Sequence, residues 1–188
     1  MQKKKKLMSL CSEIYFLRHL KTINNDLQII SGQSDSNIVC KDLTIPLEPC
    51  KFDKIYCSPS SRCKKTLAFF KEKIASAHDI VFDKHLLERH MGDFEGMRKE
   101  KVALMYPDFF IDGMFDVFKT PPKGGSYDCF KERVENFYNK CISNDCKILI
   151  CSHNQTLKML RLLILKKRVT HEEWKRYSFK NGELVKIR

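Results

Sequence analysis

Residues 14–19 read IYFLRH, so that four apolar residues, 14–17, lead directly into an arginine and a histidine. Three further apolar runs have the same branched and aromatic character, at residues 55–57, 80–82 and 148–151. None of the four alternates polar with apolar residues, which is typical of strands that are covered on both faces. Residues 14–17 therefore predict one strand of a buried, mainly parallel sheet.

Helical patterns lie between these runs. Residues 58–60, Ser-Pro-Ser, are typical of a helix start, and we expect a helix from there to about Ile74. Apolar residues recur with a helical period over 127–141, and residues 157–165 are apolar almost all round, as in a buried helix. Asn-Gly at 181–182 lies between two short strand-like runs and predicts a hairpin turn. Strands that alternate with helices predict a three-layer α/β fold, in which helices flank a mainly parallel central sheet.

The length and composition favour one domain. The chain has 188 residues, of which 43% are apolar, enough for a core. We expect residues 1–12 to be a basic N-terminal tail and residues 13–188 to be a single domain. Residues 97–123 carry four phenylalanines and predict either a cap over a pocket or a helical excursion packed on the core. No apolar run reaches the roughly 18 residues that a membrane helix needs, so we expect no membrane partner.

The charge favours an anionic partner. Lys and Arg number 35 against 23 Asp and Glu, a formal net charge of +12, which suits nucleic acid, a membrane surface or a phosphorylated small molecule, unless it serves solubility alone. The basic residues are scattered and match no nucleic-acid motif, so nucleic acid is disfavoured as a partner.

The cysteines and the N-terminus bear on the compartment. The nine cysteines include no CxxC pair, and the N-terminal apolar run is too short for a secretory signal. We expect reduced cysteines and a cytoplasmic protein.

Polar side chains follow the predicted strands where ligands bind in open α/β sheets, beyond the carboxyl ends. Arg18 and His19 follow the first strand, Arg62 lies beyond the second, Glu88 lies in the loop after the third, and His153 follows the fourth. Arginine matches phosphate oxygens in a fixed fork, neutral imidazole can attack phosphorus, and a protonated carboxyl can supply a departing oxygen with a proton. Without any metal-ligand spacing, this set predicts a phosphoryl-transfer site.

The same residues lie in four motifs that resemble those of the histidine phosphatase superfamily, the phosphoglycerate-mutase-like enzymes. In chain order the motifs are Phe16-Leu17-Arg18-His19 with Thr22 and Asn25, residues 57–66 (CSPSSRCKKT), Leu86-Leu87-Glu88 with Gly92 and Glu95-Gly96, and residues 150–153 (ICSH). A weaker likeness covers residues 122–126 (PKGGS) with Arg133. The resemblance extends over nearly the whole chain and implies the fold of that family.

The resemblance also implies a role for each matching residue. His19 would be the nucleophile that becomes a phosphohistidine, and Glu88 would donate a proton to the leaving oxygen and then act as the base for water. The residues that would bind the phosphoryl group are Arg18, Arg62, His153 and Asn25. Ser31 and Gly32 would border the substrate. The family chemistry requires no metal and no cofactor.

We therefore expect a metal-independent phosphatase that acts on a small-molecule phosphomonoester. A phosphoglycerate mutase is the nearest alternative, although mutases of the family are generally longer and tend to have tyrosine at the position of Met91. A third alternative is a phosphoanion- or nucleic-acid-binding module that has lost catalysis.

The sequence departs from the family pattern at three positions. Leu20 and Asn154 stand where the family usually has glycine, and Gly125 replaces a glutamate. Leu20 could narrow the pocket or displace the loop of His19. Neither the substrate nor the oligomeric state can be read from the sequence.

Overall fold

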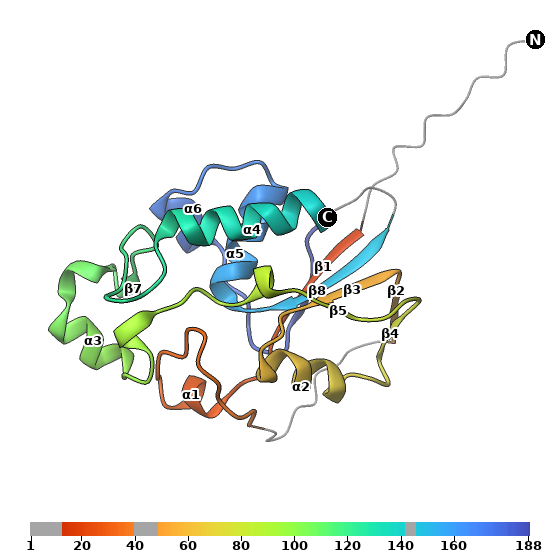
Figure 1. Ribbon diagram of the computed structural model, residues 1–188, viewed down its shortest axis with the longest axis horizontal. Coiled ribbons are helices and arrows are strands. Elements are labelled where there is room, and N and C mark those ends of the chain that lie inside the picture. Colours follow the sequence, from red (N-terminus) through yellow and green to blue (C-terminus); the bar gives the residue numbers. More distant parts are fainter. Residues whose placement is uncertain (1–12, 40–48, 142–145) are drawn as a thin grey trace, which may run out of the picture.

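The computed structural model describes residues 13–39, 49–141 and 146–188, so the predicted basic tail lies outside the described residues. Its centre is a five-stranded sheet with the spatial order β5-β3-β8-β1-β9 (Figure 1). The strands of this sheet are β1 (Glu13–Arg18), β3 (Lys54–Cys57), β5 (Val81–Phe82), β8 (Lys147–Ser152) and β9 (Leu184–Lys186). The first four run parallel to one another, and β9 pairs antiparallel with β1.

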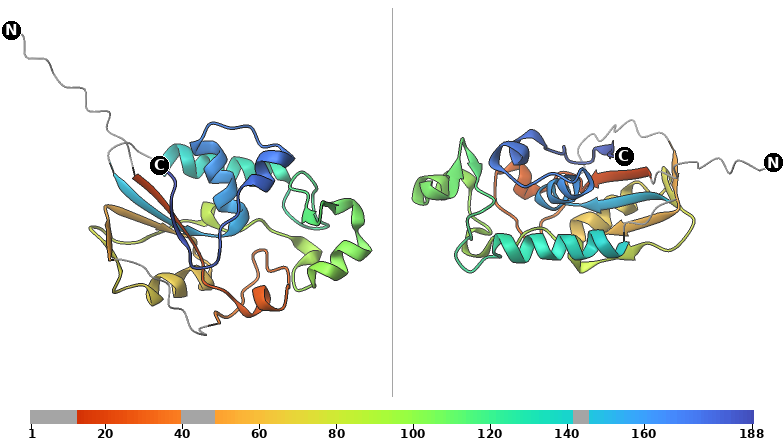
Figure 2. Two further views of the ribbon diagram at one scale, coloured as in Figure 1. Left: turned by 180° about the vertical axis from the view of Figure 1, so that it is seen from behind. Right: turned by 90° about the horizontal axis from the view of Figure 1, so that it is seen from above.

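Helices cover both faces of this sheet (Figures 1 and 2). On one face, α4 (Tyr127–Cys141) and α5 (Asn154–Ile164) share a core with Phe16. On the other face, α2 (Ser61–Phe69) shares a core with Leu17. Successive side chains of a strand point to opposite faces, so neighbouring residues of β1 enter different cores. The prediction of a three-layer α/β fold with a mainly parallel sheet is confirmed.

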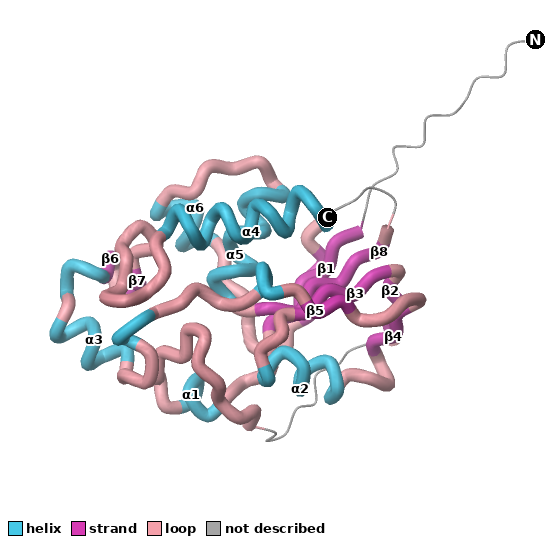
Figure 3. Tube along the Cα trace, viewed as in Figure 1, coloured by secondary structure: helices cyan, strands magenta, loops and turns pink. Residues whose placement is uncertain are grey.

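The remaining elements lie outside the central sheet and its three longest helices (Figure 3). They are α1 (Ile23–Asp26), β2 (Cys50–Phe52), β4 (Ile74–Ser76), α3 (Lys99–Met105), β6 (Phe110–Ile111), β7 (Met114–Phe115), α6 (His171–Arg176) and the 3₁₀ turns Lys84–Leu86, Gly92–Phe94 and Pro107–Phe109. Residues 97–123, which contain α3 and the β6–β7 hairpin, extend beyond the carboxyl ends of the parallel strands. Among the described residues, no helix has both the length and the apolar character needed to span a membrane.

Two sequence-based predictions of elements were wrong in part. The helix expected to reach Ile74 ends at Phe69, and Ile74 begins β4, which pairs with β2. Ile74 still joins the core that contains Leu67 and Phe70. The three apolar residues therefore face the same core, but from a helix followed by a strand and not from one helix. The run 80–82 was expected to be covered on both faces. Instead β5 is an edge strand of two residues, Val81 and Phe82, which are 47% and 51% exposed.

The predicted hairpin at residues 181–182 was also wrong, although the turn itself is present. Gly182 has a φ of +73°, which suits glycine in such a turn. Only the run after it forms a strand, β9, and that strand pairs with β1 instead of folding back on the preceding residues. As a result the turn packs against the site, because Asn181 Nδ2 donates a hydrogen bond to the carbonyl oxygen of His19 over 3.0 Å.

Candidate active site

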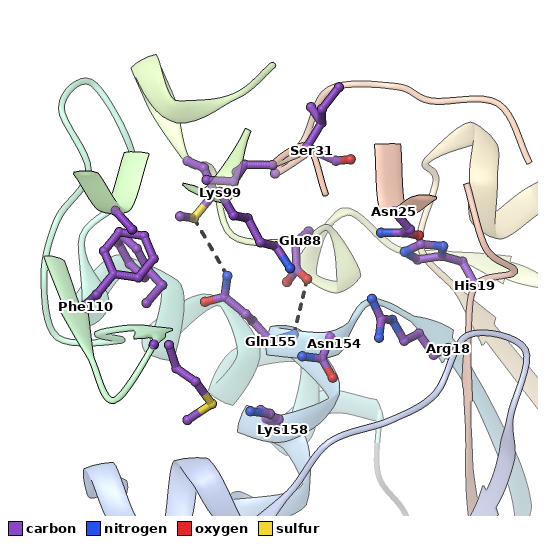
Figure 4. A pocket seen from close by; sticks show the side chains of 18 of the residues that line it. Arg18, His19, Asn25, Ser31, Glu88, Lys99, Phe110, Asn154, Gln155 and Lys158 are labelled. Atoms are coloured by element: carbon purple, nitrogen blue, oxygen red, sulfur yellow. Dashed lines mark hydrogen bonds between the residues drawn. The ribbon is translucent and has the colours of Figure 1, made fainter. Parts of the chain in front are cut away.

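A pocket of about 430 Å³ lies at the carboxyl ends of the parallel strands. Seven of the eight predicted site residues line it: Arg18, His19, Asn25, Ser31, Gly32, Arg62 and Glu88. The eighth, His153, is fully buried beside them, with 5.2 Å between its ring centroid and that of His19. Segments far apart in the sequence therefore meet at one site (Figure 4).

The ring of His19 is held in one tautomer. His19 follows β1, where its backbone N–H donates to the carbonyl oxygen of Ser152 over 3.0 Å. Its Nδ1 lies 2.7 Å from the carbonyl oxygen of Leu20, and because a carbonyl only accepts, Nδ1 carries the proton and Nε2 keeps its lone pair. Burial, followed by the charges of Arg62 and Arg18, lowers the pKa of His19 to about 3. The imidazole is therefore neutral at neutral pH.

Arg18 presents an unsatisfied donor at this site. Its Nη1 donates to the carbonyl oxygen of Phe179 over 2.7 Å, whereas its Nε is buried and has no hydrogen-bond partner among the described residues. Burial lowers the pKa of Arg18, an effect that the nearby Glu88 carboxylate opposes, but a guanidinium stays charged. A buried donor without a partner is uncommon and costly, and Arg18 itself lines the pocket.

Arg62, in the first turn of α2, connects a loop to the second histidine. Its Nη1 and Nη2 donate to the carbonyl oxygens of Ser34 and Gly32, each over 2.7 Å. Its Nε donates to Nδ1 of His153 over 3.1 Å. A guanidinium has five N–H groups, so two remain for a ligand. Arg62 thus holds the loop of Ser31 and Gly32 against the strand ends.

Both ring nitrogens of His153 have hydrogen-bond partners. Because Nδ1 accepts from Arg62, Nε2 carries the proton, and it lies 2.9 Å from Oγ of Ser58, which can accept it. Burial, followed by the charge of Arg62, lowers the pKa of His153 well below its ordinary value. His153 is fully buried and does not line the pocket, so its contact with a phosphoryl group stays a prediction.

The carboxylate of Glu88 lies at the N-terminus of α5, where free backbone N–H groups favour a negative charge. It accepts from the backbone N–H groups of Gln155 and Thr156, each over 3.2 Å, and from Oγ1 of Thr156 over the same distance. The backbone N–H of Arg89 adds a fourth bond of 3.1 Å. These bonds aim the carboxyl group from its loop toward the pocket.

Two arginines, the buried Arg89 and the half-buried Arg133, hold the loop of Glu88, and sequence reasoning gave neither this role. Arg133 donates to the carbonyl oxygens of Leu87 over 2.7 Å and of Glu88 over 3.2 Å. Arg89 is fully buried and donates to three carbonyl oxygens within residues 117–125. Its neighbour Glu88 therefore lies on a backbone that is fixed from both sides. The place of Arg133 in a weak motif was the only signal that the sequence offered.

The loop of Ser31 and Gly32 requires a glycine. Gly32 has a φ of +49°, and a Cβ there would lie 2.1 Å from Oε1 of Glu95. Glu95 accepts from the backbone N–H groups of Gln33 and Ser34 over 2.9 and 3.0 Å, so it cannot easily withdraw. The glutamate therefore joins two loops that border the pocket.

Leu20 does not narrow the pocket, although the sequence suggested that it could. Its side chain is fully buried in the core beneath α2, and it does not line the pocket. Its backbone N–H donates to Oγ1 of Thr66 over 2.8 Å. Asn154 does line the pocket, and its Oδ1 accepts from the backbone N–H of Phe179 over 3.2 Å. Neither residue has a positive φ, so neither position needs the conformational freedom of glycine.

Other residues also line the pocket; the sequence indicated the phenylalanines of 97–123 as part of a possible cap, but it did not indicate the lysines, Met114 or Trp174. From the segment 97–123 come Lys99, Phe110, Met114 and Phe115, and from the C-terminal part come Lys158 and Trp174. Burial, with a smaller effect of Arg18, lowers the pKa of Lys99. The only available signal for Lys158 was its position inside an otherwise apolar helix. In the part of the chain that the structure describes, no three His, Cys, Asp or Glu side chains gather as a metal site would require.

Comparisons with known proteins show which family this chain resembles. The family model described as "Histidine phosphatase superfamily (branch 1)" matches residues 14–188. A Hydrogenobacter thermophilus protein named "Putative phosphoserine phosphatase 2" is 26% identical over 159 residues, which are 80% of this chain and 77% of that protein. The 2,3-bisphosphoglycerate-dependent phosphoglycerate mutase of Cytophaga hutchinsonii is 25% identical over 160 residues, 79% of this chain and 75% of that protein.

Solved structures share the fold. The structure of Bacillus stearothermophilus YhfR superposes with a TM-score of 0.73 at 22% identity, covering 93% of this chain and 89% of that one. The match of the family model over almost the entire described chain confirms the resemblance on which the site residues were predicted. The chain belongs to branch 1 of the histidine phosphatase superfamily.

Proposed function

We propose that this chain is a phosphatase that hydrolyses a small-molecule phosphomonoester in two steps, through a phosphohistidine on His19. The observation that carries the proposal is the hydrogen bond between Nδ1 of His19 and the carbonyl oxygen of Leu20. It leaves a neutral imidazole with an available Nε2 lone pair in a pocket that two arginines also line. Membership of the family and the name of the Hydrogenobacter relative support the same reaction class.

In the first step, Nε2 of His19 attacks phosphorus and the ester P–O bond breaks. The leaving alcohol oxygen takes a proton from the carboxyl group of Glu88. The guanidinium of Arg18, which lines the pocket, and the two unused N–H groups of Arg62 stabilise charge on the phosphoryl oxygens. Asn25, in the wall of the same pocket, adds a contact to this group.

In the second step, the Glu88 carboxylate takes a proton from a water molecule, which attacks the phosphorus of the phosphohistidine. The N–P bond breaks, inorganic phosphate leaves, and His19 regains its lone pair. We propose that no metal ion takes part, because Arg18 and Arg62 supply the positive charge that Mg²⁺ supplies in kinases. The segment 97–123 acts in this proposal as a cap, since Phe110 and Phe115 from it line the pocket.

The experiment follows phosphate release from p-nitrophenyl phosphate, with a parallel search for phosphoenzyme after denaturation in acid and in alkali. We expect turnover that survives EDTA, and a phosphoenzyme that acid destroys and alkali preserves. His19→Ala should abolish both, with less than about 0.1% of turnover remaining, because no other group replaces the nucleophile. The matched control is His78→Ala, which removes an exposed histidine and should change neither.

The remaining outcomes separate the alternatives. Normal turnover by a folded His19→Ala variant would overturn the mechanism, and a complete loss in EDTA that metal restores would overturn the metal-free part. Isomerisation of phosphoglycerate without release of inorganic phosphate would indicate a mutase. Salt-dependent binding of nucleic acid without turnover of any ester would indicate a binding module.

A further inference from the structure

A lysine is buried in the wall of the pocket. Lys158 belongs to the apolar helix α5, lines the pocket and is only 5% exposed. Its neighbours on either side, Leu157 and Met159, are fully buried in the core. Lysine is almost never buried unless its charge has a partner, because an unpaired charge is expensive to remove from water. The charge of Lys158 therefore needs an explanation.

The partners that the chain provides for Lys158 are neutral. Its Nζ donates to the carbonyl oxygen of Trp174 over 3.0 Å and lies 5.4 Å from the centroid of the indole ring. Within the described ranges it forms no salt bridge, and two of its three N–H groups have no hydrogen-bond partner. Burial lowers the pKa of Lys158 to about 8, so the ammonium is still mostly charged at pH 7.

The pocket carries more positive charge than a simple phosphomonoester requires. Four basic side chains line it and two acidic ones oppose them, namely Arg18, Arg62, Lys99 and Lys158 against Glu88 and Glu100. In the proposed first step Glu88 is protonated, which leaves a formal surplus of three positive charges. A phosphomonoester dianion neutralises two of these, so one positive charge remains for another part of the substrate.

The position of Lys158 suits a group attached close to the ester. Figure 4 shows Arg18 and His19 at one end of the pocket, Phe110 of the cap at the other end, and Lys158 between them on α5. Lys158 follows Asn154 by four residues, so both side chains lie on the pocket side of the helix. Glu88 and Arg18 are close enough for their charges to alter its pKa.

We infer that Lys158 binds a second anionic group of the substrate, so that the enzyme prefers phosphomonoesters whose alcohol also carries a carboxylate or a second phosphate near the ester. This inference rests on the proposed phosphatase function and defines its substrate class. The two unused N–H groups of Lys158 would donate to that anion, and the cap residues would cover the rest of the molecule.

The test compares two substrates that differ in one group. In 3-phosphoglycerate a carboxylate replaces the hydroxymethyl group of sn-glycerol 3-phosphate. We expect kcat/KM for phosphate release to favour 3-phosphoglycerate by at least tenfold. Lys158→Met keeps most of the side-chain length without the charge, and it should lower kcat/KM for 3-phosphoglycerate at least tenfold more than for glycerol phosphate. Lys158→Arg should retain the preference, and the exposed control Lys71→Met should leave both values unchanged.

A second substrate pair distinguishes the kinds of anion. Propane-1,3-diol bisphosphate against its monophosphate tests a second phosphate in place of a carboxylate, and a preference in either pair that depends on Lys158 supports the inference. Absence of both preferences, or equal losses on all substrates in Lys158→Met, overturns it and shows that Lys158 only holds α6 through Trp174. Failure of the proposed function is different: no ester, including p-nitrophenyl phosphate, would be hydrolysed.

If Lys158→Met does not fold, the pH dependence of the wild-type preference decides. As pH rises from 7 to 9, Lys158 loses its proton and the preference for the acidic substrate must fall, and a constant preference overturns the inference. The charged groups near it are Glu88 and Arg18, and Trp174 contributes only its ring and carbonyl. Lys99 also has a lowered pKa, so the same profile is measured in Lys99→Met, where the fall must persist.

Discussion

Nε of Arg62 donates a hydrogen bond to Nδ1 of His153 over 3.1 Å, and this contact requires an imidazole that is not protonated at Nδ1. His19, whose ring centroid lies 5.2 Å away, is also neutral, because burial and the charges of Arg62 and Arg18 lower its pKa. The site therefore contains two neutral histidines beside two arginines. In this arrangement His19 can act as a nucleophile, and the positive charges of the two arginines are available to bind an anionic substrate.

The first prediction concerns stability in acid. In the unfolded chain each histidine binds a proton below its ordinary pKa of about 6.5. In the folded chain the pKa of His19 is about 3, and burial lowers the pKa of His153 well below its ordinary value. Unfolding therefore takes up protons below pH 6.5, so the free energy of unfolding is unaffected above that pH and falls as the pH falls. Two protons correspond to a loss of up to about 2.7 kcal/mol per pH unit.

Urea denaturation at pH 7.5, 6.5, 5.5 and 5.0 measures this slope. His19→Gln and His153→Gln should each remove about half of it, whereas His78→Gln, at an exposed position, should leave it unchanged. The same slope in all four proteins would contradict the assignment, since it would mean that other groups take up the protons.

The second prediction concerns Leu20, where the resemblance to the family led us to expect glycine. Because the side chain is buried in the core and its φ is negative, Leu20→Gly should create a cavity without relieving any strain. We expect the free energy of unfolding to fall by about 3–5 kcal/mol. Turnover of p-nitrophenyl phosphate by the folded fraction should not rise. A marked gain in kcat would instead show that Leu20 restricts the site.

The third prediction compares two glycines with positive φ. Gly96 has a φ of +82° and open space where a Cβ would lie, so Gly96→Ala should cost only the backbone strain, about 1–2 kcal/mol. Gly32→Ala carries the same strain and in addition places its Cβ against Glu95. Thermal denaturation should show the larger loss in Gly32→Ala, and kcat/KM should fall only there, because Arg62 and Glu95 both hold that loop. Equal effects would show that the close approach has no functional consequence.

The sequence predicted which side chains come together at the pocket better than it predicted where the helices and strands end. Arg18, His19 and Glu88 were expected together because the carboxyl ends of parallel strands share one edge of a sheet, a consequence of topology alone. The end of α2 was not predictable, since Ile74 enters the same core from a strand as it would from a helix. The spacing of apolar residues along the sequence does not distinguish a longer helix from a helix followed by a strand.

Contacts between distant segments account for the other differences. Lys158 is buried because α6 brings Trp174 over it, and no local pattern in α5 reveals that neighbour. Arg89 and Arg133 bind backbone carbonyls, which every residue has, so their partners leave no trace in the sequence. Leu20 appeared unfavourable by comparison with a motif, but its environment is set by α2 and β1.

The last prediction tests whether Glu88 is an acid or an anchor. Its carboxylate accepts backbone hydrogen bonds from Gln155 and Thr156 at the start of α5, so an anchoring role alone is a real alternative. Glu88→Gln keeps the shape and a hydrogen-bond acceptor but has no proton to transfer. An alkyl phosphate such as glycerol phosphate has a poor leaving group, and its kcat should fall by about 10²–10⁴-fold. For p-nitrophenyl phosphate, whose leaving group needs little protonation, the fall should be much smaller.

A variant that loosens the backbone gives a second readout of the same role. Arg133→Lys is the companion variant, because it loosens the backbone of Glu88 without removing the carboxyl group. It should lower kcat on both esters to a similar extent. Equal losses on both esters in Glu88→Gln, as in Arg133→Lys, would assign Glu88 to anchoring its loop on α5 and would leave the leaving-group proton to another donor.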